Sequence, residues 1–258
     1  MGHERIGTLP RTKRWRAIVD AITTLSSFSS TEVAQLADST LHNVSGRFLS
    51  IYKDKGVQAA FGYLIALATS HLPCSSGLTS PETSLHENPS PARIVKNLRD
   101  WVKCHTKSHE YAEIACRAAA DTIAGWTRTH SKQHLLFDDS STAHSIWTQS
   151  SNGAGFCEVS RSFFSHFTGR YLKYFLEREA SAQLFSIKTR EDFTRNLHQH
   201  IDQISQHAFE TSKITQSFAA GWYNNHARTS RPSDTELEGF LAIAFGKVHE
   251  ELDREAGE

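Results

Sequence analysis

The sequence lacks any apolar run long enough to cross a membrane. The longest one, at residues 57–68, has the length of a core helix and falls short of the ~18 residues that a membrane span requires. No apolar run of signal length follows the basic start, so a secretory leader is not expected. Cysteine is sparse too, and the four cysteines form no Cys-x2-Cys pair. We therefore expect reduced thiols in a cytoplasmic protein without a membrane partner.

An excess of charge of either sign is also missing. Lys plus Arg and Asp plus Glu both number 28 in the 258 residues, so the formal net charge is zero. This balance argues against wholesale nucleic-acid binding by a strongly basic surface. The charges are nevertheless uneven, with a basic cluster near the start and an acidic cluster near the end. The clusters include Arg11, Lys13, Arg14 and Arg16, and Glu250, Glu251, Asp253, Glu255 and Glu258.

The basic cluster has two interpretations. It is either a solvated terminus or an arm that binds phosphates or an acidic partner surface. Its residues stand at the start of the first predicted helix, where positive charge opposes the helix dipole. The second interpretation predicts a nucleic-acid-binding accessory protein that uses Arg11, Lys13, Arg14 and Arg16.

Strand-like alternation of polar and apolar residues is nearly absent, whereas helical spacing appears almost everywhere. We therefore predict an all-α, multi-helix bundle. One helix start carries a capping box, in which Ser233 and Glu236 satisfy each other's backbone amides. The predicted helices cover about 15–25, 29–51, 57–72, 92–127, 156–184, 189–226 and 233–252.

Proline is rare outside one stretch, which sets the predicted domain organisation. Four of the six prolines lie at residues 73–91, where they exclude a continuous helix because proline lacks an amide proton. Eleven of the fifteen phenylalanines follow residue 150, so the main core is expected there. We predict an N-terminal helical segment (1–72) packed against a C-terminal helical domain (93–258), joined by a Pro/Ser-rich flexible linker or long loop (73–92).

The predicted helix at residues 156–184 is apolar on two faces. Such a helix is buried on two sides, either within its own domain or against a partner. One face carries Phe156, Phe163, Phe167, Tyr171 and Tyr174, and the other carries Leu172 and Leu176. This pattern favours a non-enzymatic helical interaction or accessory subunit of a larger intracellular multi-protein assembly. Other protein subunits are the expected partners, and a homo-oligomer fits the same pattern.

Two aromatic residues near the end of the longest predicted helix are candidates for partner contact. Trp222 and Tyr223 open the segment WYNNH, and large aromatic rings beside polar groups are typical of interface hot spots. The same composition also suits a helix end that lies on a hydrophobic core.

Histidine and cysteine gather between Cys104 and Cys116. On one predicted helix, His105, His109 and Cys116 would share a face, but His105 and Cys116 would lie ~16 Å apart along the axis, too far for one metal ion. That face is otherwise apolar, so we predict buried, hydrogen-bonded histidines and no metal. His200 and His207 lie in a second apolar stripe, and the four histidines would form a buried polar layer if both helices pack together.

The segment RNLHQH contains Arg195 and His200 in an Arg-x4-His pattern. It resembles the motif of the HEPN ribonucleases, including the polar residue after the arginine. The resemblance implies a compact helical bundle that pairs, so that two motifs form one metal-independent RNA-cleaving site. His200 would move a proton, and Arg195 would hold the scissile phosphate. The same spacing recurs at Arg161 and His166, and this endoribonuclease hypothesis is the alternative to the interaction subunit.

Other enzymatic signatures are missing. The sequence has no phosphate-binding loop, dinucleotide-binding turn, zinc-protease helix, serine-hydrolase elbow or zinc-finger spacing. No cofactor is therefore expected, and the sequence leans against an enzyme without deciding the question.

Overall fold

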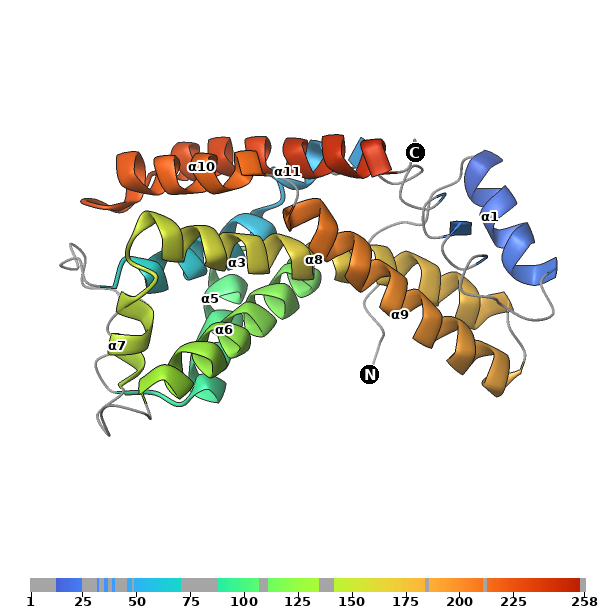
Figure 1. Cartoon of the computed structure of the whole chain (residues 1–258), viewed down its shortest axis with the longest axis horizontal. Helices are drawn as coiled ribbons and strands as arrows, with labels where there is room; N and C mark the ends of the chain where they lie inside the picture. The colour runs from blue at the N-terminus through green and yellow to red at the C-terminus, as the bar shows by residue number, and fades with distance from the viewer. Residues whose placement is uncertain are drawn as a thin grey trace.

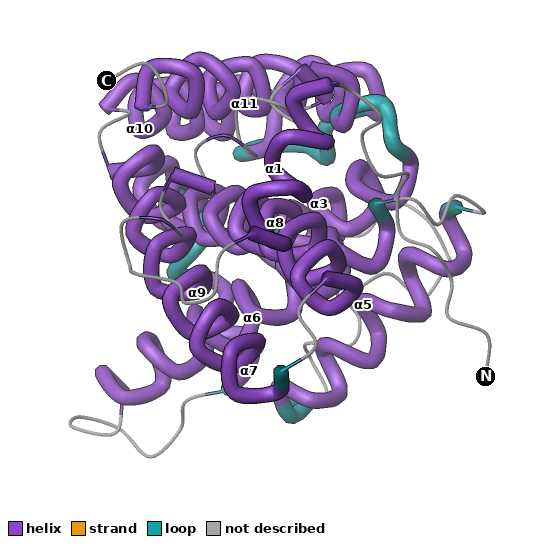
Figure 2. Tube along the Cα trace, turned by 90° about the vertical axis from the view of Figure 1, so that its right-hand side faces the viewer, coloured by secondary structure: helices purple, strands orange, loops and turns teal. Residues whose placement is uncertain are grey.

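The structure, a computed structural model, describes residues 13–24, 49–70, 88–106, 111–134, 142–183, 186–210 and 213–255, with isolated positions between 32 and 47. All regular elements in these ranges are helices, which confirms the predicted all-α bundle (Figure 2). They are α1 (Lys13–Thr24), α3 (Lys55–Ala68), α5 (Pro91–His105), α6 (Ala112–His134), α7 (Ala143–Thr148), α8 (Gly153–Gln183), α9 (Ile187–Glu210), α10 (Lys213–Trp222), the π-helix η1 (Tyr223–Ala227) and α11 (Asp234–Glu255).

The helices lie in layers around two central ones. α10 and α11 run along one side of the molecule, α3 and α8 occupy the middle, and α5, α6 and α7 lie on the other side (Figure 1). α8 packs against α6, α9 and α10, and α1 also contacts it. Phe163 and Leu176, on opposite faces of α8, are both fully buried. The predicted two-sided burial of this helix is therefore confirmed, and it is achieved within the chain.

α3 belongs to the predicted N-terminal segment and is almost entirely buried. Asp54 caps it by accepting hydrogen bonds from the amides of Gly56 and Val57, and 12 of its 14 residues are buried. The Phe61 ring lies 5.1–6.2 Å, centroid to centroid, from four rings of the C-terminal helices, among them Phe163 and Phe240. α3 thus shares one core with those helices. Most of the predicted linker lies outside the described residues, so the domain division stays a prediction.

The helix predicted for residues 92–127 is two helices, which corrects the sequence-based prediction. α5 ends at His105, and Thr106 has extended backbone angles of φ −144° and ψ 144°. α6 then begins at Ala112, close to the start of α3. A Cβ atom on Gly56 would come within 2.4 Å of the Ala112 Cβ, so this close approach requires glycine.

The helix predicted for residues 189–226 is also divided. It comprises α9 and α10, and α10 passes directly into η1 next to Gly221. The predicted capping box of α11 is confirmed, because the Glu236 amide donates to Ser233 Oγ and the Ser233 amide donates to Glu236 Oε2. Within the described part of the chain, no helix combines the length and the apolar character needed to span a membrane.

Candidate functional site

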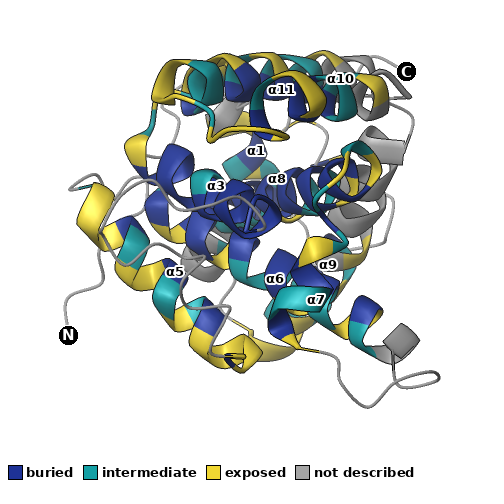
Figure 3. Ribbon diagram, turned by 90° about the vertical axis from the view of Figure 1, so that its left-hand side faces the viewer, coloured by how far each residue is buried: buried dark blue, intermediate teal, exposed yellow. Residues whose placement is uncertain are grey.

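Four exposed cations stand on α5, and three of them, Lys96, Arg99 and Lys103, follow Arg93 in the chain. The helix starts at Pro91, after Ser90 Oγ accepts a hydrogen bond from the Arg93 amide. Its buried side follows a four-residue spacing that packs against α3 and α6. Lys96, Arg99 and Lys103 are exposed. The exposed side of α5 faces away from the core (Figure 3). We call these three residues the α5 cation stripe.

The α5 cation stripe makes no ion pair among the described residues. No carboxylate there lies within ion-pair distance of its three side chains, although Asp100 is exposed on the same side of α5. Like charges three or four residues apart destabilise a helix by about 0.2–0.5 kcal/mol per pair. The helix dipole favours Lys103 in the last turn of α5, and Asp100 stands four residues after Lys96, so helix stability accounts for part of this grouping. It does not account for Arg99, which stands three or four residues from both lysines.

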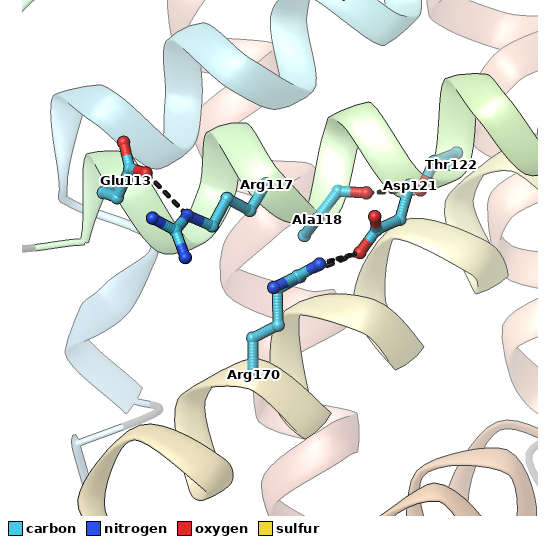
Figure 4. Close-up of polar contacts among 6 residues, drawn as sticks. All are labelled: Glu113, Arg117, Ala118, Asp121, Thr122 and Arg170. Atoms are coloured by element: carbon cyan, nitrogen blue, oxygen red, sulfur yellow. Dashed lines mark hydrogen bonds and ion pairs between the residues drawn. The ribbon is translucent and has the colours of Figure 1, made fainter. Parts of the chain in front are cut away.

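Two arginines on the neighbouring helices, by contrast, are paired. Arg117 Nε donates to Glu113 Oε1 at 2.6 Å within α6, and Arg170 on α8 holds Asp121 on α6 (Figure 4). The Arg170 Nε atom lies 2.8 Å from Asp121 Oδ2. This surface supplies carboxylate partners to arginines on α6 and α8 and leaves the α5 cation stripe without one.

The stripe also acts on a buried thiol of α6. Burial, and then the charge of Glu113, raise the pKa of Cys116 to about 11, while Arg99 and Lys103 act in the opposite direction. Arg99 and Lys103 therefore lie close enough to the first turns of α6 to affect the pKa of the Cys116 thiol. Cys104, near the end of α5, is exposed, whereas Cys116 and Cys157 are buried.

The structure corrects the prediction of a buried His105. The side chain is exposed because α5 ends there, beyond the last buried residue of its apolar face. Its Nδ1 atom lies 2.8 Å from the Trp101 carbonyl oxygen, and its ring stacks on the Trp101 indole at 4.0 Å. His109 lies outside the described residues.

The predicted polar layer required two helices to be neighbours. α5 packs mainly against α3 and α6, whereas α9, which carries His200 and His207, packs mainly against α8 and α11. The side chains of His200 and His207 fall outside the described part of the chain. The two histidine-bearing helices have different principal neighbours, and the polar layer, which depended on their packing together, stays a prediction.

A buried histidine does exist, at a position that the sequence reasoning missed. His130 on α6 stacks on Trp126 at 3.7 Å, and its Nδ1 atom lies 2.9 Å from the Trp126 carbonyl oxygen. The sequence feature that could have predicted this stacked pair is a Trp-x3-His spacing, which places the two rings one helical turn apart. It occurs at Trp101–His105, at Trp126–His130 and at Trp222–His226.

Trp222 and Tyr223 lie in the core. Only 8% of Trp222 and none of Tyr223 is exposed. The Tyr223 ring stacks on Phe156 at 5.0 Å, and its hydroxyl donates to the Ala68 carbonyl oxygen at 3.3 Å. The wider turn of η1 accompanies the inward placement of both consecutive rings. The structure therefore supports the core interpretation of this helix end, and these rings offer little surface to a partner.

His226, at the end of η1, contacts the start of α11. Its Nδ1 atom lies 2.8 Å from Glu236 Oε1, and Glu236 Oε2 accepts hydrogen bonds from the amide and hydroxyl of Ser233. The hydrogen bond from the Ser233 amide, followed by that from His226, lowers the pKa of Glu236 to about 2. The contact between His226 and Glu236 joins the end of η1 to the start of α11. Ser233 contacts the Glu236 carboxylate and not the His226 imidazole.

The remaining predicted residues are scattered. Arg195 is exposed on α9, where its Nη1 atom donates to Asp192 Oδ1 at 3.1 Å. Lys13 and Arg16 are exposed on α1, while Arg11 and the side chain of Arg14 lie outside the described residues. The structure does not gather these residues into one site.

Comparisons with other proteins add no functional assignment. No protein-family model matches the chain, and no curated protein or solved structure matches it significantly. In the ranges that the structure covers, no three His, Cys, Asp or Glu side chains come together as metal ligands do. Function is therefore inferred from the geometry of this chain.

Proposed function

We propose that the protein is a non-enzymatic helical interaction subunit of a larger intracellular multi-protein assembly, and that the α5 cation stripe is its partner-binding surface. The observation that carries this proposal is the grouping of three cations without ion pairs on one exposed side of α5. Arg117 and Arg170 form ion pairs with carboxylates, and the three cations of the stripe form none among the described residues. A partner that brings carboxylates to α5 would relieve the repulsion among the three cations.

A protein fits this surface better than a nucleic acid does. The chain has a formal net charge of zero, so it exerts no general attraction on a polyanion. Asp100 stands beside Arg99, and its carboxylate would repel a continuous phosphate backbone. A protein partner can instead place a lysine or arginine next to Asp100 and form an ion pair with it. Individual exposed ion pairs contribute only about 0.2–1 kcal/mol, so the stripe mainly sets specificity and the rate of encounter.

Binding of a defined acidic peptide tests the proposal. The probe is a synthetic helical peptide with glutamates spaced three and four residues apart, and its binding is measured by fluorescence anisotropy at low and high salt. One triple variant, Lys96→Gln, Arg99→Gln and Lys103→Gln, removes the stripe. A matched control, Arg128→Gln, Lys188→Gln and Arg228→Gln, removes the same charge from exposed positions on other elements.

We expect the wild type and the control to bind alike, and the stripe variant to bind at least about tenfold more weakly. High salt should abolish the difference between the two variants, because exposed charges are screened. Equal binding by the stripe variant and the control at low salt would refute the proposed surface.

A further inference from the structure

We infer that the partner of the α5 cation stripe is an acidic helix that carries one lysine or arginine within its acidic face, placed to pair with Asp100. This inference rests on the proposed function, because it concerns the same surface of α5. It adds the secondary structure and the charge pattern of the partner, which follow from the spacing of the three cations and from the position of Asp100 among them.

Asp100 is an anion within a cationic surface. It is exposed, and no ion pair in the part of the chain that the structure describes involves it. Lys96 stands four residues before it and Lys103 three residues after it, spacings that permit an ion pair on a helix, yet neither forms one with Asp100. A partner that brings only carboxylates to this surface would therefore place like charge beside Asp100.

The spacing of the α5 cation stripe matches that of a second helix. Arg99 lies about 4.5 Å from Lys96 and about 6 Å from Lys103 along the axis of α5, because an α-helix rises about 1.5 Å per residue. A helix beside α5 presents carboxylates at the same two intervals when they stand three and four residues apart. Alternate residues of a β-strand are about 6.6–6.8 Å apart, so a strand would not match either interval.

Helix geometry also places the partner's cation. Arg99 and Asp100 lie on opposite sides of the line from Lys96 to Lys103, because successive residues of a helix point about 100° apart. An antiparallel partner sets its partially positive start beside the partially negative end of α5. In that orientation, glutamates at its first and eighth positions lie level with Lys103 and Lys96. Its fourth position lies on the side of Arg99 and takes a glutamate, and its fifth lies on the side of Asp100 and takes the lysine or arginine.

Two synthetic helical peptides test this charge pattern. Both carry glutamates at the first, fourth and eighth positions, and the fifth position is lysine in one and glutamine in the other. Fluorescence anisotropy at low salt measures their binding to the wild type, to Asp100→Asn and to a control, Glu191→Gln, which removes an exposed carboxylate from α9. General attraction to a cationic surface favours the glutamine peptide, which has the larger negative charge. An ion pair with Asp100 favours the lysine peptide instead.

We expect the wild type and Glu191→Gln to bind the lysine peptide at least about twofold more tightly than the glutamine peptide, and Asp100→Asn to lose this preference. All three proteins meet the same two peptides, so a difference in helicity between the free peptides does not produce such a change. A wild type that prefers the glutamine peptide, or a preference that Asp100→Asn leaves unchanged, would overturn the inference.

The triple variant Lys96→Gln, Arg99→Gln and Lys103→Gln separates this result from the proposed function. If both peptides bind the wild type more tightly than the triple variant, but Asp100→Asn does not alter the preference between them, only the charge pattern assigned to the partner is removed. If the wild type and the triple variant bind both peptides equally, the surface itself is removed.

Discussion

The imidazole of His226 and the carboxylate of Glu236 join the π-helix to the last helix of the bundle. His226 Nδ1 and Glu236 Oε1 are 2.8 Å apart, although the residues lie on separate elements. Because Glu236 also accepts hydrogen bonds from Ser233, its charged form is held by three donors. The carboxylate is thus both the cap of α11 and the anchor of η1.

Glu236 should make the protein more sensitive to acid. Its pKa is about 2 in the folded protein, below the ordinary 4.5, so it contributes stability above pH 4.5 that disappears as the pH falls towards 2. Glu236→Gln removes this contribution. We expect the difference in unfolding free energy between wild type and Glu236→Gln to be largest near neutral pH and to shrink through this window in urea titrations. Glu191→Gln, at an exposed position, is the control, and a difference that stays constant down to pH 2 would contradict the prediction.

Two glycine substitutions should change stability in opposite directions. In Gly56→Ala, the new Cβ would lie 2.4 Å from Ala112 Cβ and 2.7 Å from Ala112 Cα, so backbone must move, at a loss of about 1–3 kcal/mol. In Gly239→Ala, nothing lies within 4 Å of the new Cβ on an exposed helical position, so a gain of about 0.5–1 kcal/mol is expected. Urea unfolding compares them. Equal effects would mean that α3 and α6 do not approach so closely.

The helical class, the two-sided burial of α8 and the start of α11 were predictable from the sequence. Each depends on local information, namely residue spacing or a capping box. The break at Thr106 was not predictable, because no proline or glycine marks it in the segment between α5 and α6. It accompanies the approach of Ala112 to Gly56, a contact between residues far apart in sequence.

The candidate site was less predictable than the fold. Lys96, Arg99 and Lys103 show helical spacing in the sequence, but their lack of ion pairs depends on which helices lie beside α5. For Trp222 and Tyr223, the sequence does not distinguish a core position from an interface position. Their composition suits an interface or a core equally well, and only packing against Phe156 decides between them.

The cysteines should differ sharply in reactivity. Cys104 is exposed, whereas burial raises the pKa of both Cys116 and Cys157. In a Cys74→Ser background, we expect a disulfide reagent to modify one thiol at least about tenfold faster than the other two at neutral pH. Adding Cys104→Ser should remove the fast phase, and urea should expose all remaining thiols. A fast phase that survives this substitution would show that a buried cysteine is accessible.

The ribonuclease hypothesis makes a separate prediction. Arg195 is already held by Asp192 on the same helix, which partly offsets the charge that a scissile phosphate would need. We expect the purified protein not to cleave RNA in the absence of metal ions. Cleavage that is lost in both Arg195→Ala and His200→Ala, but kept in the neighbouring His198→Ala, would establish the enzyme and refute the non-enzymatic proposal. A gel assay with single-stranded RNA measures this directly.

The burial of α3 has a consequence for the synthesis of the protein. Several of the helices that cover this apolar helix follow it in sequence, and α11 begins about 165 residues after α3 ends. At roughly 5–20 residues per second, a ribosome needs about 8–33 s to make that length. During this interval the nascent chain carries an apolar helix without its final cover. Chaperone binding to the growing chain should therefore begin once α3 emerges and end only after α11 has followed.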